Sequence, residues 1–85
     1  MNITLRFFAS VREILGTSQE ALALPAHVTT VGELRAFLLA RGGAWTEALA
    51  EGRSLRMACN QIMCQPEATL SEACEVAFFP PVTGG

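Results

Sequence analysis

The residues of this chain best suited to chemistry are Gly84 and Gly85, the last two of its 85 residues. Neither has a side chain, so this end of the chain can enter a narrow channel and adopt backbone angles closed to other residues. Its reactive group is the α-carboxylate of Gly85, which is ionised at neutral pH because its reference pKa is ~3.3 to 3.7. A carboxylate resists nucleophiles, but adenylation by ATP would turn it into an acyl group with a good leaving group. Attack by a sulfur nucleophile would then give a C-terminal thiocarboxylate.

The residues before this diglycine predict an extended segment. Pro80 and Pro81 lack an amide N–H and hold φ near ~−65°, so they should end a strand and direct the chain outward. Six residues, counted from Pro80, reach about 20 Å when fully extended. We therefore expect a folded domain over residues 1–79 and an extended, flexible C-terminal tail over residues 80–85.

The three cysteines do not predict a metal site or a catalytic thiol. Cys59, Cys64 and Cys74 lack the spacing of metal ligands, and one histidine in the whole chain cannot complete a four-ligand set. We expect Cys59 to be a small core residue. Cys74 falls in a predicted turn, where it could be exposed, but nothing near it would lower the pKa of a thiol. We therefore expect no metal and no bound cofactor.

The composition predicts one small globular domain. Hydrophobic residues make up 51% of the chain and charged residues 16%, which is too apolar for a disordered chain. Lysine is absent and the six arginines are scattered, so nothing indicates nucleic-acid binding. No apolar run approaches the ~20 residues of a membrane span, and the N-terminus lacks the pattern of a signal peptide. We expect a cytoplasmic protein with reduced thiols.

Period-two alternation of apolar residues predicts strands at both ends of the chain. In the last strand, Val76 and Phe78 should face inward, and Ala77 and Phe79 outward. Asn60-Gln61 should form a tight turn between two short apolar segments. The predicted strands are residues 2–9, 19–24, 55–59, 62–64 and 75–79, with residues 66–74 as a connecting loop.

Capping-box patterns predict two helix starts. Ser10 with Glu13 should open a helical turn that ends at Gly16. Thr30 with Glu33 should open the main helix, and a short extra helix should run over residues 45–51. Strands flanking one long helix predict a two-layer α+β domain, with the helix across one face of the sheet. The first and last strands are the most hydrophobic, so we expect them to lie side by side, parallel, at the centre of the sheet in a β-grasp arrangement.

Two motifs carry a resemblance to a known family. The C-terminal run EVAFFPPVTGG resembles the end of molybdopterin synthase small subunits, and the N-terminal run FASVREILG resembles their first strand and the turn after it. Asn60 also matches, and the resemblance spans the whole chain. One departure lies before the last strand, where the family usually carries Gly-Asp and this chain has Ala73-Cys74. We expect this difference to affect the turn and not the tail.

The resemblance implies a ubiquitin-like β-grasp fold with a mixed sheet, and a sulfur-carrier function. A ubiquitin-activating-like enzyme would adenylate Gly85 with ATP, and a sulfur donor would convert it to the thiocarboxylate. The chain would dock on the large subunit of molybdopterin synthase, in a heterotetramer, and pass its sulfur to a cyclic pyranopterin phosphate. Two loaded carriers would be needed for the two sulfurs of the dithiolene. Most catalytic residues and the pterin contacts would lie in the large subunit, with Gly84 and Gly85 as this chain's part of the active site.

The docking surface can be predicted from the strand pattern. Phe8 and Phe79 fall on the solvent side of neighbouring central strands, and exposed aromatic rings side by side are typical of interfaces. Met63, which follows an inward Ile62, could extend this patch. The residues predicted to bind the partner are therefore Phe8, Met63, Phe79, Pro80, Pro81, Val82 and Thr83.

Two other functions stay open at this point. The chain could be another diglycine carrier, either the sulfur carrier of the thiamine pathway or a ubiquitin-like modifier, although thiamine carriers typically lack the Phe-Phe-Pro-Pro ending. It could also be an interaction domain whose tail does no chemistry. Loading with sulfur in the presence of ATP distinguishes the carriers from the inert domain.

Overall fold

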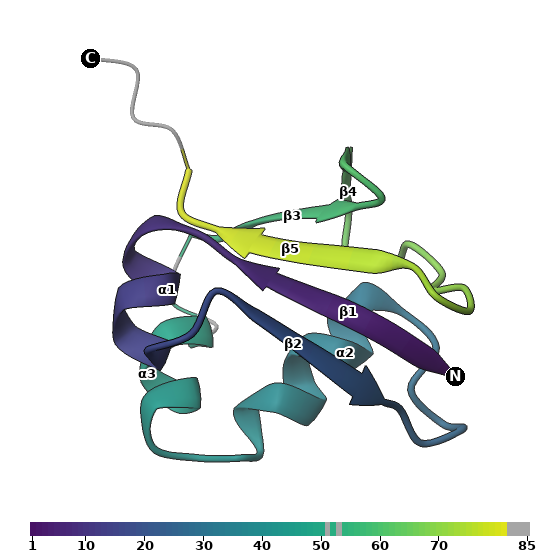
Figure 1. The fold of residues 1–85 in the computed structure, drawn as a ribbon, viewed down its shortest axis with the longest axis horizontal. Helices are drawn as coiled ribbons and strands as arrows, with labels where there is room; N and C mark the ends of the chain where they lie inside the picture. The colour runs from purple at the N-terminus through teal and green to yellow at the C-terminus, as the bar shows by residue number, and fades with distance from the viewer. Residues whose placement is uncertain (51, 53, 82–85) are drawn as a thin grey trace.

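The computed structural model describes residues 1–50, 52 and 54–81, which form one five-stranded sheet with three helices. The strand that comes fifth in the sequence lies in the middle of the sheet (Figure 1). The elements are β1 (Asn2–Phe7), α1 (Ala9–Leu15), β2 (Gln19–Ala23), α2 (Val31–Leu39), α3 (Ala44–Leu49), β3 (Arg56–Cys59), β4 (Ile62–Cys64) and β5 (Glu75–Phe79).

The sheet has the order β2-β1-β5-β3-β4, with β1 and β5 parallel and the other neighbours antiparallel. Its strands alternate as predicted: Leu5 and Phe7 of β1, and Val76 and Phe78 of β5, are at most 1% exposed. Side chains of successive strand residues point to opposite faces, so these four share one face. The predicted mixed sheet with parallel first and last strands is thus confirmed.

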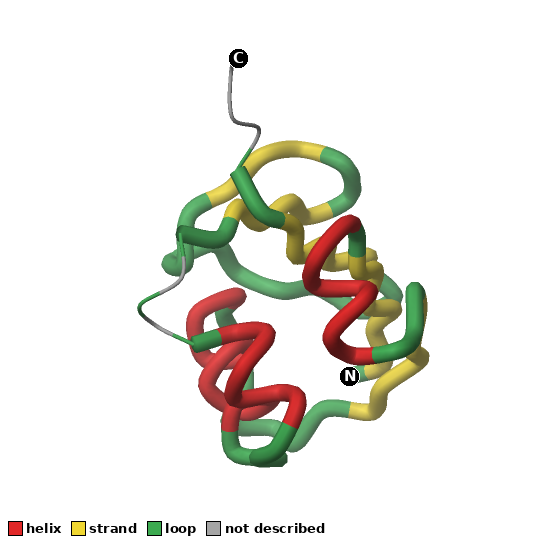
Figure 2. The backbone as a smooth tube through the Cα atoms, turned by 90° about the vertical axis from the view of Figure 1, so that its left-hand side faces the viewer, coloured by secondary structure: helices red, strands yellow, loops and turns green. Residues whose placement is uncertain are grey.

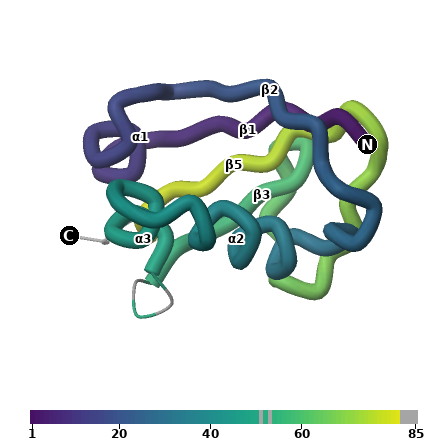
Figure 3. The backbone as a smooth tube through the Cα atoms, turned by 90° about the horizontal axis from the view of Figure 1, so that it is seen from below, coloured from purple at the N-terminus to yellow at the C-terminus, as the bar shows by residue number. Residues whose placement is uncertain are grey.

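The helices cover one face of the sheet, and the other is left open. Figure 3 shows α2 and α3 on the near side of the strands, and Figure 2 shows the helices gathered beside the sheet. Val11 of α1, Leu34 and Leu38 of α2, and Leu49 of α3 are fully buried in one cluster with the inward strand residues. Trp45 packs its ring edge-on against Phe7 at 5.6 Å between centroids.

The predicted capping box of the main helix is present. The Thr30 hydroxyl accepts a hydrogen bond from Glu33 N at 3.2 Å, and Glu33 Oε1 accepts one from Thr30 N at 3.1 Å. The backbone and hydroxyl of Thr29 donate to the same carboxylate, both at 2.9 Å, and these bonds are the main reason that the pKa of Glu33 is lowered. Two orphan amides at the helix start are satisfied in this way.

The other predicted capping box is wrong. Helix α1 begins at Ala9 with Phe8 as its N-cap, and no side chain caps it, so Ser10 already lies inside the helix. The strand ends at Phe7 and the chain turns sharply at Ala9, whose φ is 52°. The end of the helix is as predicted: Gly16 has φ 75°, and its amide donates to Arg12 O.

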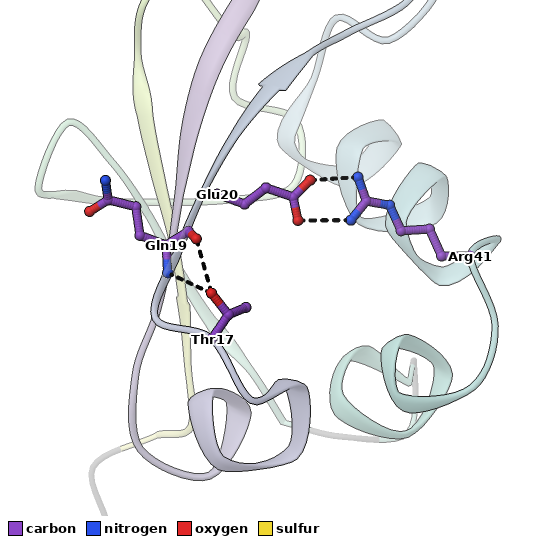
Figure 4. A network of polar contacts seen from close by, with 4 residues as sticks. All are labelled: Thr17, Gln19, Glu20 and Arg41. Carbon is purple, nitrogen blue, oxygen red and sulfur yellow. Dashed lines mark hydrogen bonds and ion pairs between the residues drawn. The ribbon is translucent and has the colours of Figure 1, made fainter.

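The connection between β1 and β2 is held by polar contacts at the surface (Figure 4). Thr17 Oγ1 donates to Gln19 O at 3.0 Å and accepts from Gln19 N at 3.4 Å. One residue further on, the Glu20 carboxylate accepts two hydrogen bonds from Arg41, at 3.0 and 2.7 Å. Because Arg41 follows α2, this bidentate pair ties the helix layer to the edge of the sheet.

Two turns beside the central strands contain residues with positive φ. Asn60 and Gln61 have φ 51° and 68° and form the predicted tight turn between β3 and β4. Ala73 has φ 65°, at the position where the family that the sequence resembles usually carries glycine. Its amide donates to Asn2 O at 2.7 Å, so the turn before β5 keeps its contact with β1 despite a residue that disfavours this conformation.

Candidate functional site at the base of the C-terminal tail

Strand β5 positions the end of the chain. It is hydrogen-bonded on both sides, to β1 in register Phe7 with Phe78 and to β3 in register Arg56 with Phe79. After Phe79 the chain leaves the sheet through Pro80 and Pro81, beside the start of α1 (Figure 1). A strand paired on both sides is a rigid support for whatever follows it.

The remaining predicted tail residues lie outside the described residues, and their roles stay predictions. They are Val82, Thr83, Gly84 and Gly85. The described residues nearest to them, Pro80 and Pro81, are both half-buried. The described part of the candidate site is therefore the surface at the base of the tail.

Phe8 and Phe79 are in contact on the open face, as predicted. Their ring centroids are 6.3 Å apart at an interplanar angle of 86°, an edge-to-face pair. Phe8 is 41% exposed, and Phe79 is half-buried. With Ala9 and Pro80 they line an open apolar groove of about 380 Å³. A groove of this kind at the foot of the tail is suited to packing against an apolar surface of another protein.

Met63 lies on the same face but not in this groove. It pairs with Ala58 of β3, which in turn pairs with Ala77 of β5, so its side chain shares the side of Phe79. Met63 is 53% exposed, which is compatible with the predicted docking role, although the structure places it two strands away from β5. The prediction that Ile62 points into the core is wrong, because Ile62 is 72% exposed. Strand β4 is a short strand at the edge of the sheet.

Charged residues that the sequence analysis did not single out also lie on this face. Arg6 is two residues before Phe8, and its guanidinium carbon sits 5.6 Å from the centre of the Phe8 ring. Its Nη1 is 3.5 Å from Glu75 Oε2. Arg56, directly opposite Phe79, is exposed. The alternation that placed Phe8 on the polar face could have identified Arg6, because residues two apart in a strand share a face.

The thiols of Cys59 and Cys64 are not activated as nucleophiles. Burial raises the pKa of the Cys64 thiol. The pKa of Cys59 is raised mainly by burial, and to a smaller extent by the neighbouring Cys74 and Cys64. Both thiols are therefore protonated at neutral pH and poor nucleophiles. Cys59 packs against the core as predicted. Cys74, for which the sequence left exposure open, is only 2% exposed and lies directly before β5.

The described part of the chain contains no group of three potential metal ligands. Among the same residues, no helix has the length and apolarity needed to cross a membrane.

Comparisons with known proteins agree with the motifs. The model of the ThiS family matches residues 5–85. The chain is 43% identical over 83 residues to the molybdopterin synthase sulfur carrier subunit of Escherichia coli strain K12, a match that covers 98% of this chain and 99% of the relative.

Solved structures agree on the fold. SAMP1 from Haloferax volcanii superimposes with a TM-score of 0.80 at 21% identity, over 100% of both chains. A chain from the complex of subunits 1 and 2 of the molybdopterin-converting factor from Helicobacter pylori 26695 gives a TM-score of 0.69 at 22% identity, again over 100% of both. The predicted ubiquitin-like β-grasp fold is confirmed by these neighbours, and with the sequence matches they show that this chain belongs to the ThiS family, among the relatives of molybdopterin synthase sulfur carrier subunits.

Proposed function

We propose that this chain is the sulfur-carrier small subunit of molybdopterin synthase. The observation that carries the proposal is the 43% identity to a sulfur carrier subunit over 98% of the chain. It is supported by the position of β5, which ends at Phe79 beside an open apolar groove. Fold likeness alone would not suffice, because one fold can host unrelated functions.

The chemistry proposed for Gly85 has two steps. Its carboxylate attacks the α-phosphorus of ATP on an adenylating enzyme, which releases pyrophosphate and leaves an acyl adenylate. Sulfur at the oxidation level of hydrosulfide then attacks the acyl carbon and displaces AMP, leaving a C-terminal thiocarboxylate. The raised pKa values of Cys59 and Cys64 fit this division of labour, since neither thiol is prepared to attack the activated end.

Sulfur delivery requires a partner that receives the tail. We propose that the large subunit of molybdopterin synthase packs on the groove formed by Phe8, Ala9, Phe79 and Pro80, and accepts the tail in its own active site. The similar chain from Helicobacter pylori comes from a complex of subunits 1 and 2 of its molybdopterin-converting factor, which supports such a pairing here. The acceptor would be a cyclic pyranopterin phosphate, converted to a dithiolene by two loaded carriers. The expected assembly is a heterotetramer.

The deciding experiment is a loading assay read by intact mass. The chain is incubated with ATP, an adenylating enzyme and a sulfur donor, and a mass gain equal to the exchange of one oxygen for one sulfur is expected. Adding the large subunit and the pterin precursor should return the mass to its starting value and produce molybdopterin. An unchanged mass in the first step contradicts a carrier function, and loading without subsequent transfer indicates a carrier of another pathway.

The matched control is a chain that lacks only Gly85. The deletion leaves β5 and its pairing partners intact, so the variant should fold and bind the large subunit. It should give no molybdopterin, because the acyl carbon would be displaced by one residue. Sulfur transfer by this variant would contradict the role assigned to Gly85.

A further inference from the structure

The arginines that the structure describes differ in how well their guanidinium N–H groups are paired with hydrogen-bond acceptors. Arg41 makes two hydrogen bonds to Glu20 and stacks on Trp45 at 4.5 Å. Arg35 is buried in the helix layer, where it donates to the carbonyls of Leu49 and Ala50 at the end of α3. These two guanidinium groups are held within the domain.

Arg6 is held much less well. Its one ion pair among the described residues, to Glu75, is 3.5 Å long, whereas charge-assisted hydrogen bonds are typically ~2.7 to 2.9 Å. Its Nε is buried and has no hydrogen-bond partner among the residues that the structure describes. A buried donor without an acceptor costs free energy. The Arg6 side chain as a whole is 37% exposed on the open face, so its loosely paired guanidinium can be reached from there.

Arg56 lies on the same face on the other side of β5. The register places Arg6 opposite Ala77 and Arg56 opposite Phe79. Arg56 is exposed, and within residues 1–50, 52 and 54–81 it forms no ion pair. The two cations therefore flank the aromatic pair of Phe8 and Phe79. We call these four residues the collar.

We propose that the collar recognises carboxylate side chains on the protein that accepts the tail, which we take to be the large subunit. This inference rests on the proposed function, because it assumes that the tail enters a partner. Docking on the apolar groove would remove water from the neighbouring guanidinium groups, and a desolvated cation is tolerated only when it gains an acceptor or a counter-charge. Carboxylates supply both, in the planar geometry that guanidinium prefers.

The charge pattern also gives docking a direction. The collar is cationic, while the proposed tip of the tail is an anion, either carboxylate or thiocarboxylate. A partner with an acidic rim around a basic pocket would match both, and a reversed approach would bring like charges together. The acidic rim is the part of the partner that the collar predicts.

The test is a titration of the large subunit with variants of this chain at low and high salt. Arg6→Gln and Arg56→Gln should each weaken binding at low salt by about three- to tenfold, mainly through slower association. Their double variant should lose most of the salt dependence of the wild type. Ala36→Glu on the exposed side of α2 changes the net charge by the same amount as either single variant, and it should leave the affinity within about twofold.

Three further measurements make each outcome decisive. Arg56→Lys keeps the charge and should keep the salt dependence, even if a glutamine variant proves unstable in thermal unfolding. The variant Arg56→Glu should bind poorly, and replacing an acidic residue on the partner's rim by arginine should restore its binding. If the double variant binds with unchanged affinity and salt dependence, the collar is wrong. The loading assay is read separately, so a wild type that loads and transfers sulfur upholds the proposed function whatever the collar does.

Discussion

Two pairs of phenylalanines lie on opposite faces of the sheet, and each member of one pair is the sequence neighbour of a member of the other. Phe7 and Phe78 are at most 1% exposed and stack at 6.5 Å with an interplanar angle of 18°. Phe8 and Phe79 meet edge to face on the open side, with Phe8 at 41% exposure. The same residue type thus stabilises the domain on one face and is available to a partner on the other. Stability and recognition should therefore be separable in this domain by single substitutions.

The largest effect is expected for the inner pair. Phe78→Ala removes a ring with no exposed surface from the central strand, so the free energy of unfolding should fall by about 3 to 5 kcal/mol, as for other buried aromatic truncations. Urea denaturation followed by circular dichroism measures this change. For so small a domain the loss could remove most of the stability. A decrease below about 1 kcal/mol would show that β5 does not depend on the inner pair.

The outer pair should give the reverse result. Phe79→Ala should change the free energy of unfolding by less than about 1 kcal/mol, because its ring is already partly solvated. Affinity for the large subunit should fall by about tenfold or more, as expected of an aromatic residue at the centre of an interface. Calorimetric titration measures this, with the urea midpoint as its control. Unchanged affinity would remove Phe79 from the docking surface.

A substitution in the turn before β5 should raise the stability of the domain without changing its affinity for the large subunit. Ala73 has φ 65°, and glycine accepts this conformation without the steric cost that alanine carries. Ala73→Gly should therefore raise the free energy of unfolding by about 0.5 to 1 kcal/mol, with docking unchanged. Paired urea and titration measurements check both parts. A destabilised variant would mean that the turn gains more from the alanine side chain than it loses in strain.

The smallest effect is expected for Met63. It shares the face of Phe79 but is separated from β5 by β3, so it should lie at the rim of the interface. Met63→Ala should weaken binding by about twofold, since rim contacts contribute little. The same titration series measures it, with the already exposed Ala21 of the opposite edge strand changed to Ser as a control. A loss as large as that of Phe79→Ala would place Met63 at the centre of the interface.

The sequence predicted what depends on local pattern. Alternation located β5 at residues 75–79 and assigned Phe78 inward and Phe79 outward, and the capping box located the start of α2 at Thr30. Two kinds of feature were missed. Ile62 was expected inside, because period-two alternation identifies a side of the sheet but not whether the domain covers that side at its edge. Ser10 was expected to cap the first helix, but the chain already enters the helix at Ala9.

The sequence predicted the aromatic part of the candidate site but not its charged part. The contact between Phe8 and Phe79 followed from two strands expected to be neighbours, and it is present. The poor pairing of Arg6 depends on a distance to Glu75, a residue almost seventy positions away in the chain. Only the register of β1 with β5 brings these two side chains together, so no local pattern could indicate it.

The central position of β5 also affects how the protein is made. Among the described strands, the hairpins β1–β2 and β3–β4 have no common neighbour in the sheet except β5, which follows both of them in the sequence. Such distant pairings form late because their loop must close first. During translation, the two hairpins must therefore wait for the final strand before they can join. A product of premature termination would expose their apolar edges to proteases and chaperones, so a molecule that escapes degradation is one whose synthesis has reached the base of the tail.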